Sequence, residues 1–190
     1  YSVDWEKESK KRKLSNNQNT PEALQIMTSK ESLELFKTMK VFSEVELRAR
    51  QEVELEAYIL HIQIEGRVLN GLVYNHILPS CLEYQHKLAE NILGLKNIYG
   101  AGYKKMAVAQ SAILEEIILH INGLKNECDA MTESRKSANT IKDTYKKSMA
   151  YCRNVKPLFE KIRYHSDRLE RLVDDRLWPL TKYQELLFAK

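Results

Sequence analysis

The sequence predicts an all-α protein: an elongated antiparallel bundle of three long helices, two of them kinked at proline, with short helices near both ends. Two observations predict this fold class. Glycine and proline are scarce, at 6 and 4 in 190 residues, whereas sheets and barrels use both for their turns. Hydrophobic residues make up 43% of the chain and recur at alternating spacings of three and four, which is typical of a helix packed on other helices.

The first 19 residues show no clear helical pattern, and the first predicted helix begins directly after them. Residues 1–19 are polar and read as an irregular lead-in that follows another domain. Thr20-Pro21-Glu22 predicts a short helix, with Thr20 as its cap and Pro21 at its first position. A break is expected near Thr28-Ser29, and a second short helix over Ser32–Met39. Residues 20–190 are taken as one C-terminal helical bundle domain.

The first long helix begins at Ser43, where Glu46 completes a capping box. Its predicted packing seam is Leu55, Ile59, Ile62, Gly66, Leu69, Val73 and His76, with Tyr58, Val68, Leu72 and Ile77 widening the buried stripe. Pro79 should kink or break this helix, because proline lacks an amide hydrogen and its ring collides with the carbonyl four residues back. The pattern resumes and ends at Gly100-Ala101-Gly102, the strongest turn signal in the chain.

Two more long helices follow. The next has a seam from Leu114 to Met131 and should end between Glu133 and Ala138. The last runs from Ile141 to Val173 with Pro157 inside it, and Leu177-Trp178-Pro179 ends it. A short amphipathic tail covers residues 182–188. Short connections make successive helices antiparallel neighbours.

Composition narrows the possible partners. The net charge of +4 is too small to require nucleic acid, and no run of 18 apolar residues predicts a membrane span. Cys81, Cys128 and Cys152 are few and scattered, which suits a reducing compartment and argues against a disulfide framework or a zinc site. We therefore expect a cytoplasmic protein that binds neither nucleic acid nor membrane.

Catalytic and metal-binding motifs are weak. The sequence has neither a Gly-x-Ser-x-Gly elbow nor a glycine-rich phosphate loop. Glu83 and His86 form one Glu-x-x-His motif, whereas a di-metal helical site needs two such motifs and further glutamates. A free-standing metal enzyme built on this pair stays the alternative from a different class, and we assign no catalytic, cofactor-binding or metal-binding residue.

The stretch 132–163 is basic, with nine lysines and arginines against three acids. Such a stretch is usually a solvated helix face. Its alternative is a scaffold that binds an acidic partner through Lys142, Lys146 and Lys147.

One segment, residues 62–79, mixes polar groups with almost every aliphatic residue around them. Gly66 and Gly71 would permit another backbone to approach closely. Buried polar groups need partners, so the segment forms either a hydrogen-bond network inside the bundle or a docking surface for another domain or subunit. The candidate docking residues are Gln63, Glu65, Arg67, Asn75 and His76.

Several blocks of the sequence resemble the C-terminal region of type III glutamine synthetase. They are SEVELRARQEVELE at 43–56, IQIEGRV at 62–68, NHILP at 75–79, Tyr84-Gln85 and ENILGLK at 90–96, with YSVDW and TPEAL near the start and VDD, LWPL and 183–188 near the end. Residues 101–166 agree only in helical character. Lys13 stands where glycine is expected, Gly66 where a small side chain is usual, and Thr181 where a second proline is common.

The resemblance implies a parent enzyme that makes glutamine from glutamate, ammonia and ATP through γ-glutamyl phosphate, with Mg²⁺ or Mn²⁺. In that family the metal and phosphate ligands lie upstream in the catalytic domain, and none of their motifs occurs here. This fragment alone is expected to be inactive. The resemblance implies a helical extension that braces the catalytic domain and the contacts between subunits in stacked hexameric rings.

Overall fold

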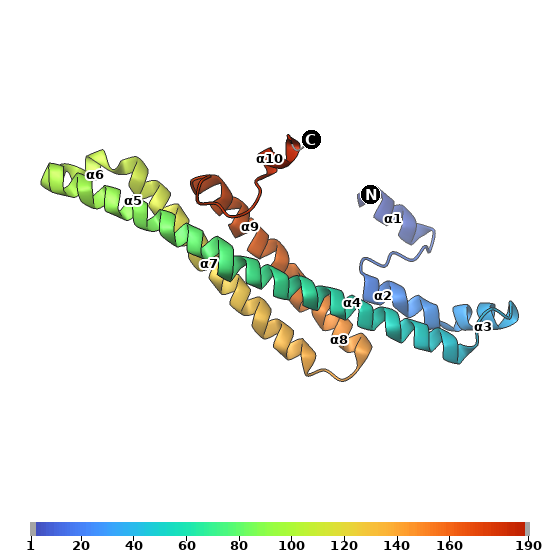
Figure 1. The fold of residues 1–190 in the computed structure, drawn as a ribbon. Coiled ribbons are helices and arrows are strands. Elements are labelled where there is room, and N and C mark those ends of the chain that lie inside the picture. Colours follow the sequence, from blue (N-terminus) through green and yellow to red (C-terminus); the bar gives the residue numbers. More distant parts are fainter. Residues whose placement is uncertain (1–2, 189–190) are drawn as a thin grey trace. The chain divides into compact units, whose positions relative to one another are not determined.

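The computed structural model describes residues 3–188 and is all-helical over that range, without a strand. The described residues contain three long helical stretches and several short helices (Figure 1), so the predicted all-α fold class with three long helices is confirmed. The long stretches cover residues 44–99, 108–139 and 144–172. The described residues form two compact units: one up to Ile62 together with Ser137–Arg153, and the other Gln63–Lys136 together with residues from Asn154 on.

The segment expected to be irregular contains a helix. α1 (Val3–Lys11) has acids in its first turn and lysines in its last, which is the favourable arrangement for the helix dipole. Arg12 and Glu8 form an ion pair of 2.8 Å between Nε and Oε1, and such pairs four residues apart support an exposed helix. The expectation of an irregular segment over residues 1–19 was therefore wrong for 3–11.

Local capping signals set most of the helix starts in the first unit. α2 (Thr20–Gln25) is capped by Asn19, not Thr20, because the Asn19 side chain accepts the N–H of Glu22 at 2.9 Å. A short turn, η1 (Ile26–Thr28), then leads to α3 (Lys30–Thr38), as the predicted break indicated. α4 (Glu44–Leu72) begins with the predicted capping box, in which Glu46 Oε2 accepts the Ser43 N–H at 2.8 Å.

Both mid-helix prolines are preceded by a π-helical turn. η2 (Val73–Ile77) precedes α5 (Leu78–Tyr99), and Pro79 is the second residue of α5. η4 (Tyr151–Val155) joins α8 (Thr144–Ala150) to α9 (Lys156–Leu172), and Pro157 is likewise the second residue of its helix. The Leu78 N–H reaches the carbonyl of Val73, five residues back. This wider turn accommodates a ring that would collide with a carbonyl four residues back in an α-helix.

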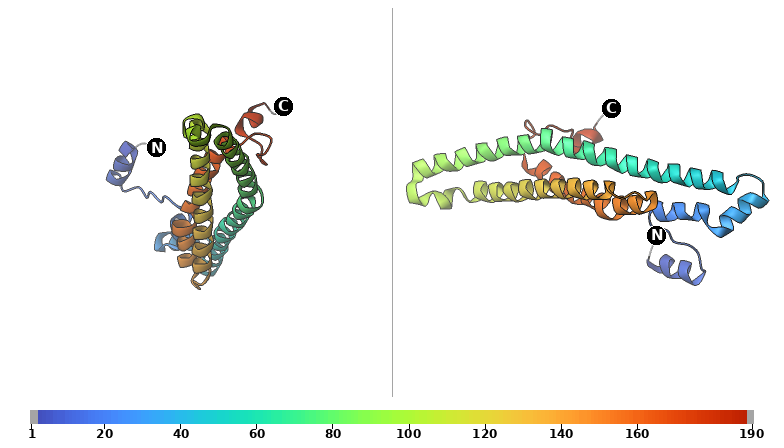
Figure 2. Two further views of the ribbon diagram at one scale, coloured as in Figure 1. Left: turned by 90° about the vertical axis from the view of Figure 1, so that its left-hand side faces the viewer. Right: turned by 90° about the horizontal axis from the view of Figure 1, so that it is seen from below.

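The remaining elements follow the predicted turns closely. Gly100 has a φ of 55° at the end of α5, in the region that glycine tolerates best. η3 (Gly100–Gly102) and α6 (Tyr103–Met106) then lead into α7 (Val108–Asn139), and Figure 2 shows α5 and α7 side by side beyond this turn. α9 ends at Leu172, earlier than predicted, where the Asp174 carboxylate accepts the Arg176 N–H at 2.9 Å in a local turn. The last helix is α10 (Tyr183–Leu187).

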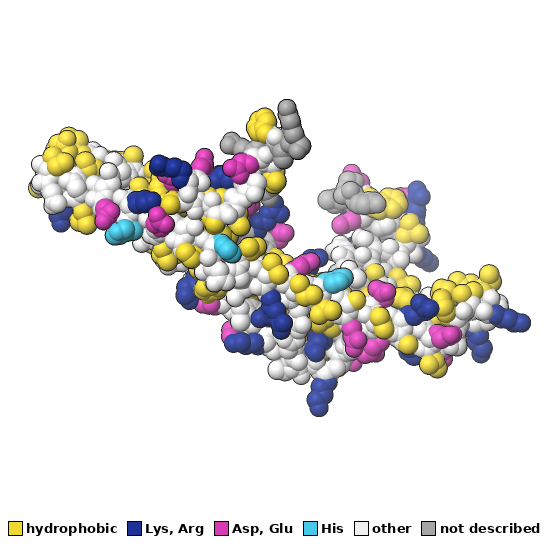
Figure 3. Space-filling model, viewed as in Figure 1, with side chains coloured by type: hydrophobic (Ala, Val, Ile, Leu, Met, Phe, Trp, Pro, Cys, Tyr) yellow, Lys and Arg dark blue, Asp and Glu magenta, His cyan; other side chains and the backbone are white. Residues whose placement is uncertain are grey.

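The core of the second unit is built from the predicted seams. Its buried side chains include Val73, Ile77, Cys81, Ile117, Leu124, Cys128, Met131, Ile162 and Leu169. His76 was predicted on the seam but is exposed, while Ile77 is buried. The reason is the π turn, which adds a residue to the helical repeat and moves the seam from position 76 to 77. Hydrophobic side chains also reach the surface, as at the end of α5 and α6 (Figure 3).

Candidate functional site

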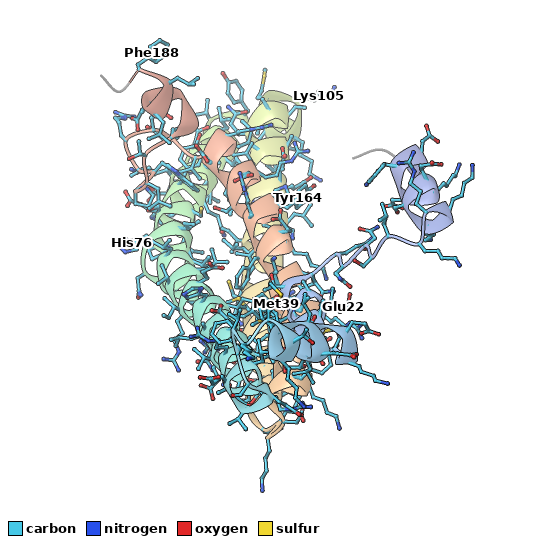
Figure 4. All side chains as sticks on the ribbon, turned by 90° about the vertical axis from the view of Figure 1, so that its right-hand side faces the viewer. Glu22, Met39, His76, Lys105, Tyr164 and Phe188 are labelled. Carbon is cyan, nitrogen blue, oxygen red and sulfur yellow. The ribbon has the colours of Figure 1, made fainter. Side chains whose placement is uncertain are left out.

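The five candidate docking residues lie on α4 and η2, all in the second unit. Glu65, Arg67, Asn75 and His76 are exposed, and Gln63 is half-buried. Figure 4 labels His76 on the outer side of its helix. Because four of the five side chains face solvent, they do not form a buried hydrogen-bond network.

Two hydrophobic residues on the same segment are also exposed. Ile64 is 49% exposed and Val68 is 55% exposed. They are four residues apart and therefore lie one above the other on one side of α4. Val68 was expected to widen the buried stripe, and the structure contradicts that expectation. We call Ile64 and Val68, together with Glu65, Arg67, Asn75 and His76, the docking face.

The signal for Ile64 and Val68 was present in the sequence. Both fall outside the alternating seam that contains Ile62 and Gly66, so helical geometry turns them away from the core. A helix that is hydrophobic on two sides either is buried on both or presents one side to a partner. Only the packing of α4 decides between these possibilities.

The two glycines of this segment differ in their surroundings. A Cβ at Gly66 would lie 3.5 Å from the Phe159 ring and 3.6 Å from Met131 Sδ, in ordinary van der Waals contact. A Cβ at Gly71 would meet nothing within 4 Å. Close packing is therefore found at Gly66, and the same expectation for Gly71 was wrong.

A hydrogen-bonded group that the sequence did not reveal joins η2, which carries Asn75 and His76 of the docking face, to α7. The Tyr74 hydroxyl donates to Asp129 Oδ1 at 2.6 Å, and Lys125 Nζ donates to Asp129 Oδ2 at 2.6 Å. The hydrogen bond to Asp129 and partial burial raise the pKa of Tyr74 to about 12. Hydrogen bonds from Lys125 and Tyr74 lower the pKa of Asp129. The π turn is thereby tied to α7.

The metal-site candidates have other partners. Glu83 pairs with Lys87 at 2.9 Å and His86 with Glu90 at 3.3 Å, all exposed on α5. Within residues 3–188, no group of three or more His, Cys, Asp or Glu side chains is arranged to hold a metal ion. All three cysteines are free, and burial raises the pKa of Cys81 and Cys128 to about 12.

The basic stretch 132–163 is partly neutralised by neighbouring acids. Its intrachain pairs are Lys136–Glu133, Arg153–Glu22, Lys161–Glu127 and Arg163–Asp167. Lys142 and Lys146 are exposed and border a polar hollow of about 480 Å³ in the first unit.

Over the part of the chain that the structure describes, none of the helices is long and apolar enough to cross a membrane.

Comparison with known proteins identifies the class of domain. Residues 1–96 match the glutamine synthetase C-terminal domain, and this match contains the docking face. A glutamine synthetase of Bacteroides fragilis (strain YCH46) is 41% identical over 191 aligned residues, covering 100% of this chain and 26% of the relative. The type-3 glutamine synthetase of Dictyostelium discoideum is 31% identical with the same coverage. A glutamine synthetase of Butyrivibrio fibrisolvens is 23% identical, again over 100% of this chain, and 27% of that relative is covered.

The chain thus has the fold of an all-helical domain, and it belongs to the glutamine synthetase C-terminal domain family. It spans about a quarter of the length of the curated relatives it matches. Similarity to these relatives extends through residues 101–166, where the sequence blocks alone had indicated only helical character.

Proposed function

We propose that this chain is the noncatalytic C-terminal helical domain of a type III glutamine synthetase, and that it braces the catalytic domain and the contacts between subunits. The observation that carries the proposal is the docking face, which is exposed within the stretch that matches the family. Ile64 and Val68 form its apolar centre, and charged and polar side chains surround them. An apolar centre with a polar rim is the usual composition of a protein interface.

The proposed occupant of the docking face is the upstream catalytic domain of the same protein. The relatives have about three-quarters of their length outside the region that this chain covers, so a large surface is available to meet the face. Arg67 is suited to a carboxylate on that surface, because a guanidinium can form two parallel hydrogen bonds with one carboxylate. The Tyr74–Asp129 hydrogen bond would hold the face in place before docking.

The chemistry of the parent belongs to the same proposal. The parent would be an ATP-dependent glutamate–ammonia ligase that forms glutamine through γ-glutamyl phosphate, with Mg²⁺ or Mn²⁺, in the cytoplasm. It would assemble as stacked hexameric rings. ATP and the metal ions would bind outside this chain, whose own work would be mechanical support.

The first test is the coding sequence upstream of Tyr1. A glutamine synthetase catalytic domain in the same reading frame is expected there. Its absence would contradict the proposal. Metal analysis of the purified 190-residue chain tests the alternative of a di-metal enzyme based on Glu83 and His86. Stoichiometric, tightly bound iron or manganese would favour that alternative.

The second test is Arg67→Ala, alone and with Val68→Asp, in the full-length protein that carries this chain. We expect loss of ring assembly by size-exclusion chromatography and reduced glutamine formation, while the 190-residue chain with the same changes keeps its helical circular dichroism and melting temperature. Arg171→Ala, an exposed arginine of α9 outside the face, is the matched control. Assembly that survives both changes would contradict docking, and melting of the isolated variant chain would favour an internal structural role.

A further inference from the structure

The turn between α5 and α7 presents an exposed hydrophobic surface in the second unit. Ile98 is 73% exposed and Val108 is 64% exposed. The full set, which we call the hairpin tip, is Leu93, Ile98, Tyr99, Met106 and Val108, with Lys96, Lys104 and Lys105 among them. α5, η3 and α6 contact one another here. Figure 3 shows hydrophobic side chains gathered at this end of α5 and α6, and Figure 4 labels Lys105 there.

The hairpin tip has a uniform charge. Residues 91–114 contain three lysines and no acid, although the whole chain has nearly equal numbers of acidic and basic residues. Lys96 Nζ lies 5.9 Å from the centre of the Tyr103 ring, and Lys104 and Lys105 are exposed. An exposed apolar surface with lysines and no acids is complementary to a partner surface that is apolar and acidic.

A surface with those properties lies in the first unit, on the N-terminal half of α4. Residues 44–56 contain five glutamates and two arginines, and all five glutamates are exposed. Val53 is 61% exposed among them. A hollow of about 430 Å³ is lined by Met27, Glu46, Ala49, Arg50, Val53 and Glu54, which we call the α4 face.

The charges on the α4 face are partly balanced within the chain. Arg48 forms an ion pair with Glu44 at 2.8 Å, and the Arg50 guanidinium stacks 4.5 Å from the centre of the Phe42 ring. The carboxylate of Glu46 is ionised at neutral pH, as is usual for an exposed glutamate, and hydrogen bonds from Ser43 lower its pKa further. Glu46 and Glu54 therefore border the apolar hollow with negative charge.

We propose that the hairpin tip of one copy of this chain docks on the α4 face of a second copy. The exposed side chains of the tip, Ile98 and Met106 above all, would enter the hollow over Val53 and Met27. Lys104 and Lys105 would approach Glu46 and Glu54. Because the two surfaces are different, the contact is head-to-tail: the copy that gives its tip keeps a free α4 face, and the copy that gives its α4 face keeps a free tip, each for a further copy.

Complementation between two variants tests this contact with the 190-residue chain alone, so its outcome is independent of the catalytic-domain docking proposed above. The tip variant carries Lys104→Glu and Lys105→Glu, and the face variant carries Glu54→Lys with Val53→Asp. Self-association of the unchanged chain is measured by sedimentation velocity at low salt and at about 1 M salt, where a charge-steered contact weakens. Each variant should self-associate at least about tenfold more weakly than the unchanged chain, as expected for like charges at a contact.

An equimolar mixture of the two variants should form a heterodimer, because the face variant keeps an intact tip and the tip variant keeps an intact face. Lys142→Glu with Lys146→Glu, two exposed lysines outside both surfaces, should associate like the unchanged chain. An unchanged chain that is monomeric at high concentration would overturn the proposal. Variants that associate normally would also overturn it, as would a mixture that stays monomeric while both variants keep their helical circular dichroism.

Discussion

His120 and His165 face each other across α7 and α9, with their Nδ1 atoms 2.9 Å apart. His120 is buried and His165 half-buried. The Tyr164 ring packs edge-on against both imidazoles. At this distance one Nδ1–H donates to the other Nδ1, and the tautomers of the two rings decide which histidine is the donor.

The charged groups around the pair come from both helices. Glu116 Oε1 lies 3.9 Å from His120 Nε2. Glu127 acts on His165 from α7 and also pairs with Lys161 of α9. The Arg168 guanidinium lies 5.6 Å from the centre of the Tyr164 ring. Burial, and then the neighbouring His120, lower the pKa of His165, while Glu127 opposes them.

The first prediction is a loss of stability in mild acid. A histidine whose pKa is lowered by folding binds protons more weakly in the folded than in the unfolded chain. Its contribution is therefore complete above the unfolded value near 6.5 and is lost as the pH falls from there through the lower pKa of the folded chain. The urea midpoint should be lower at pH 5.5 than at pH 7.5. His165→Gln should reduce this difference in urea midpoint. If the variant and the unchanged chain lose the same amount between pH 7.5 and pH 5.5, the histidine pair is not responsible for the loss.

The second prediction concerns Gly123, which makes room for the same histidine. A Cβ at this position would lie 2.3 Å from His165 Cε1, well inside van der Waals contact. Gly123→Ala should therefore destabilise the chain by about 1–3 kcal/mol, the usual cost of overpacking. The free energy of unfolding from urea titrations measures it.

Gly66→Ala is the matched control for that substitution, because its Cβ would lie 3.5 Å from the Phe159 ring without displacing it. Alanine loses less conformational freedom than glycine on entering a helix, so this variant should be more stable by about 0.5–1 kcal/mol. If Gly123→Ala were more stable to unfolding than Gly66→Ala, the packing at these two glycines would be contradicted. Gly66 is also the position where the family resemblance indicates a small side chain.

The third prediction tests the hydrogen bond between Tyr74 of η2 and Asp129 of α7. Tyr74→Phe should lower the free energy of unfolding by about 1 kcal/mol at pH 7, the usual net contribution of one hydrogen bond. A phenol whose pKa is raised to about 12 contributes stability that is complete below the ordinary value near 10 and disappears as the pH rises toward 12. The difference between Tyr74→Phe and the unchanged chain should therefore shrink above pH 10. A constant difference up to pH 12 would disprove the assignment.

The fourth prediction concerns the end of α1. Lys13 has a φ of 57°, and the Leu14 N–H returns to the Ser9 carbonyl at 2.9 Å, as in a helix that ends in a left-handed residue. For a residue with a Cβ, that backbone conformation is less favourable by roughly 1–2 kcal/mol. Lys13→Gly should slow amide hydrogen exchange in α1, whereas Lys11→Gly, inside the last turn, should speed it. Faster exchange in Lys13→Gly would refute the left-handed geometry.

Several features of the fold depend on residues close together in the chain, and these could be predicted. The capping box at Ser43 and Glu46, the turn at Gly100 and the interruptions at both prolines each involve a few neighbouring positions. Their hydrogen bonds and backbone angles are local, so composition and spacing suffice to place them. The packing seams were predictable for the same reason, since helical periodicity is a local property.

The features that no local pattern contains depend on register between distant segments. The π turn before Pro79 shifts the seam by one residue, which exposes His76, a predicted seam residue, and makes Ile77, expected only to widen the buried stripe, the seam residue. His120 meets His165 from 45 positions away, and Gly123 is needed because that ring lies against it. The sequence alone specifies which residues can face a core. The packing of the helices decides which of these residues meet, because each contact between two helices depends on the register of both. The same packing decides whether Ile64 and Val68 are covered or left for a partner.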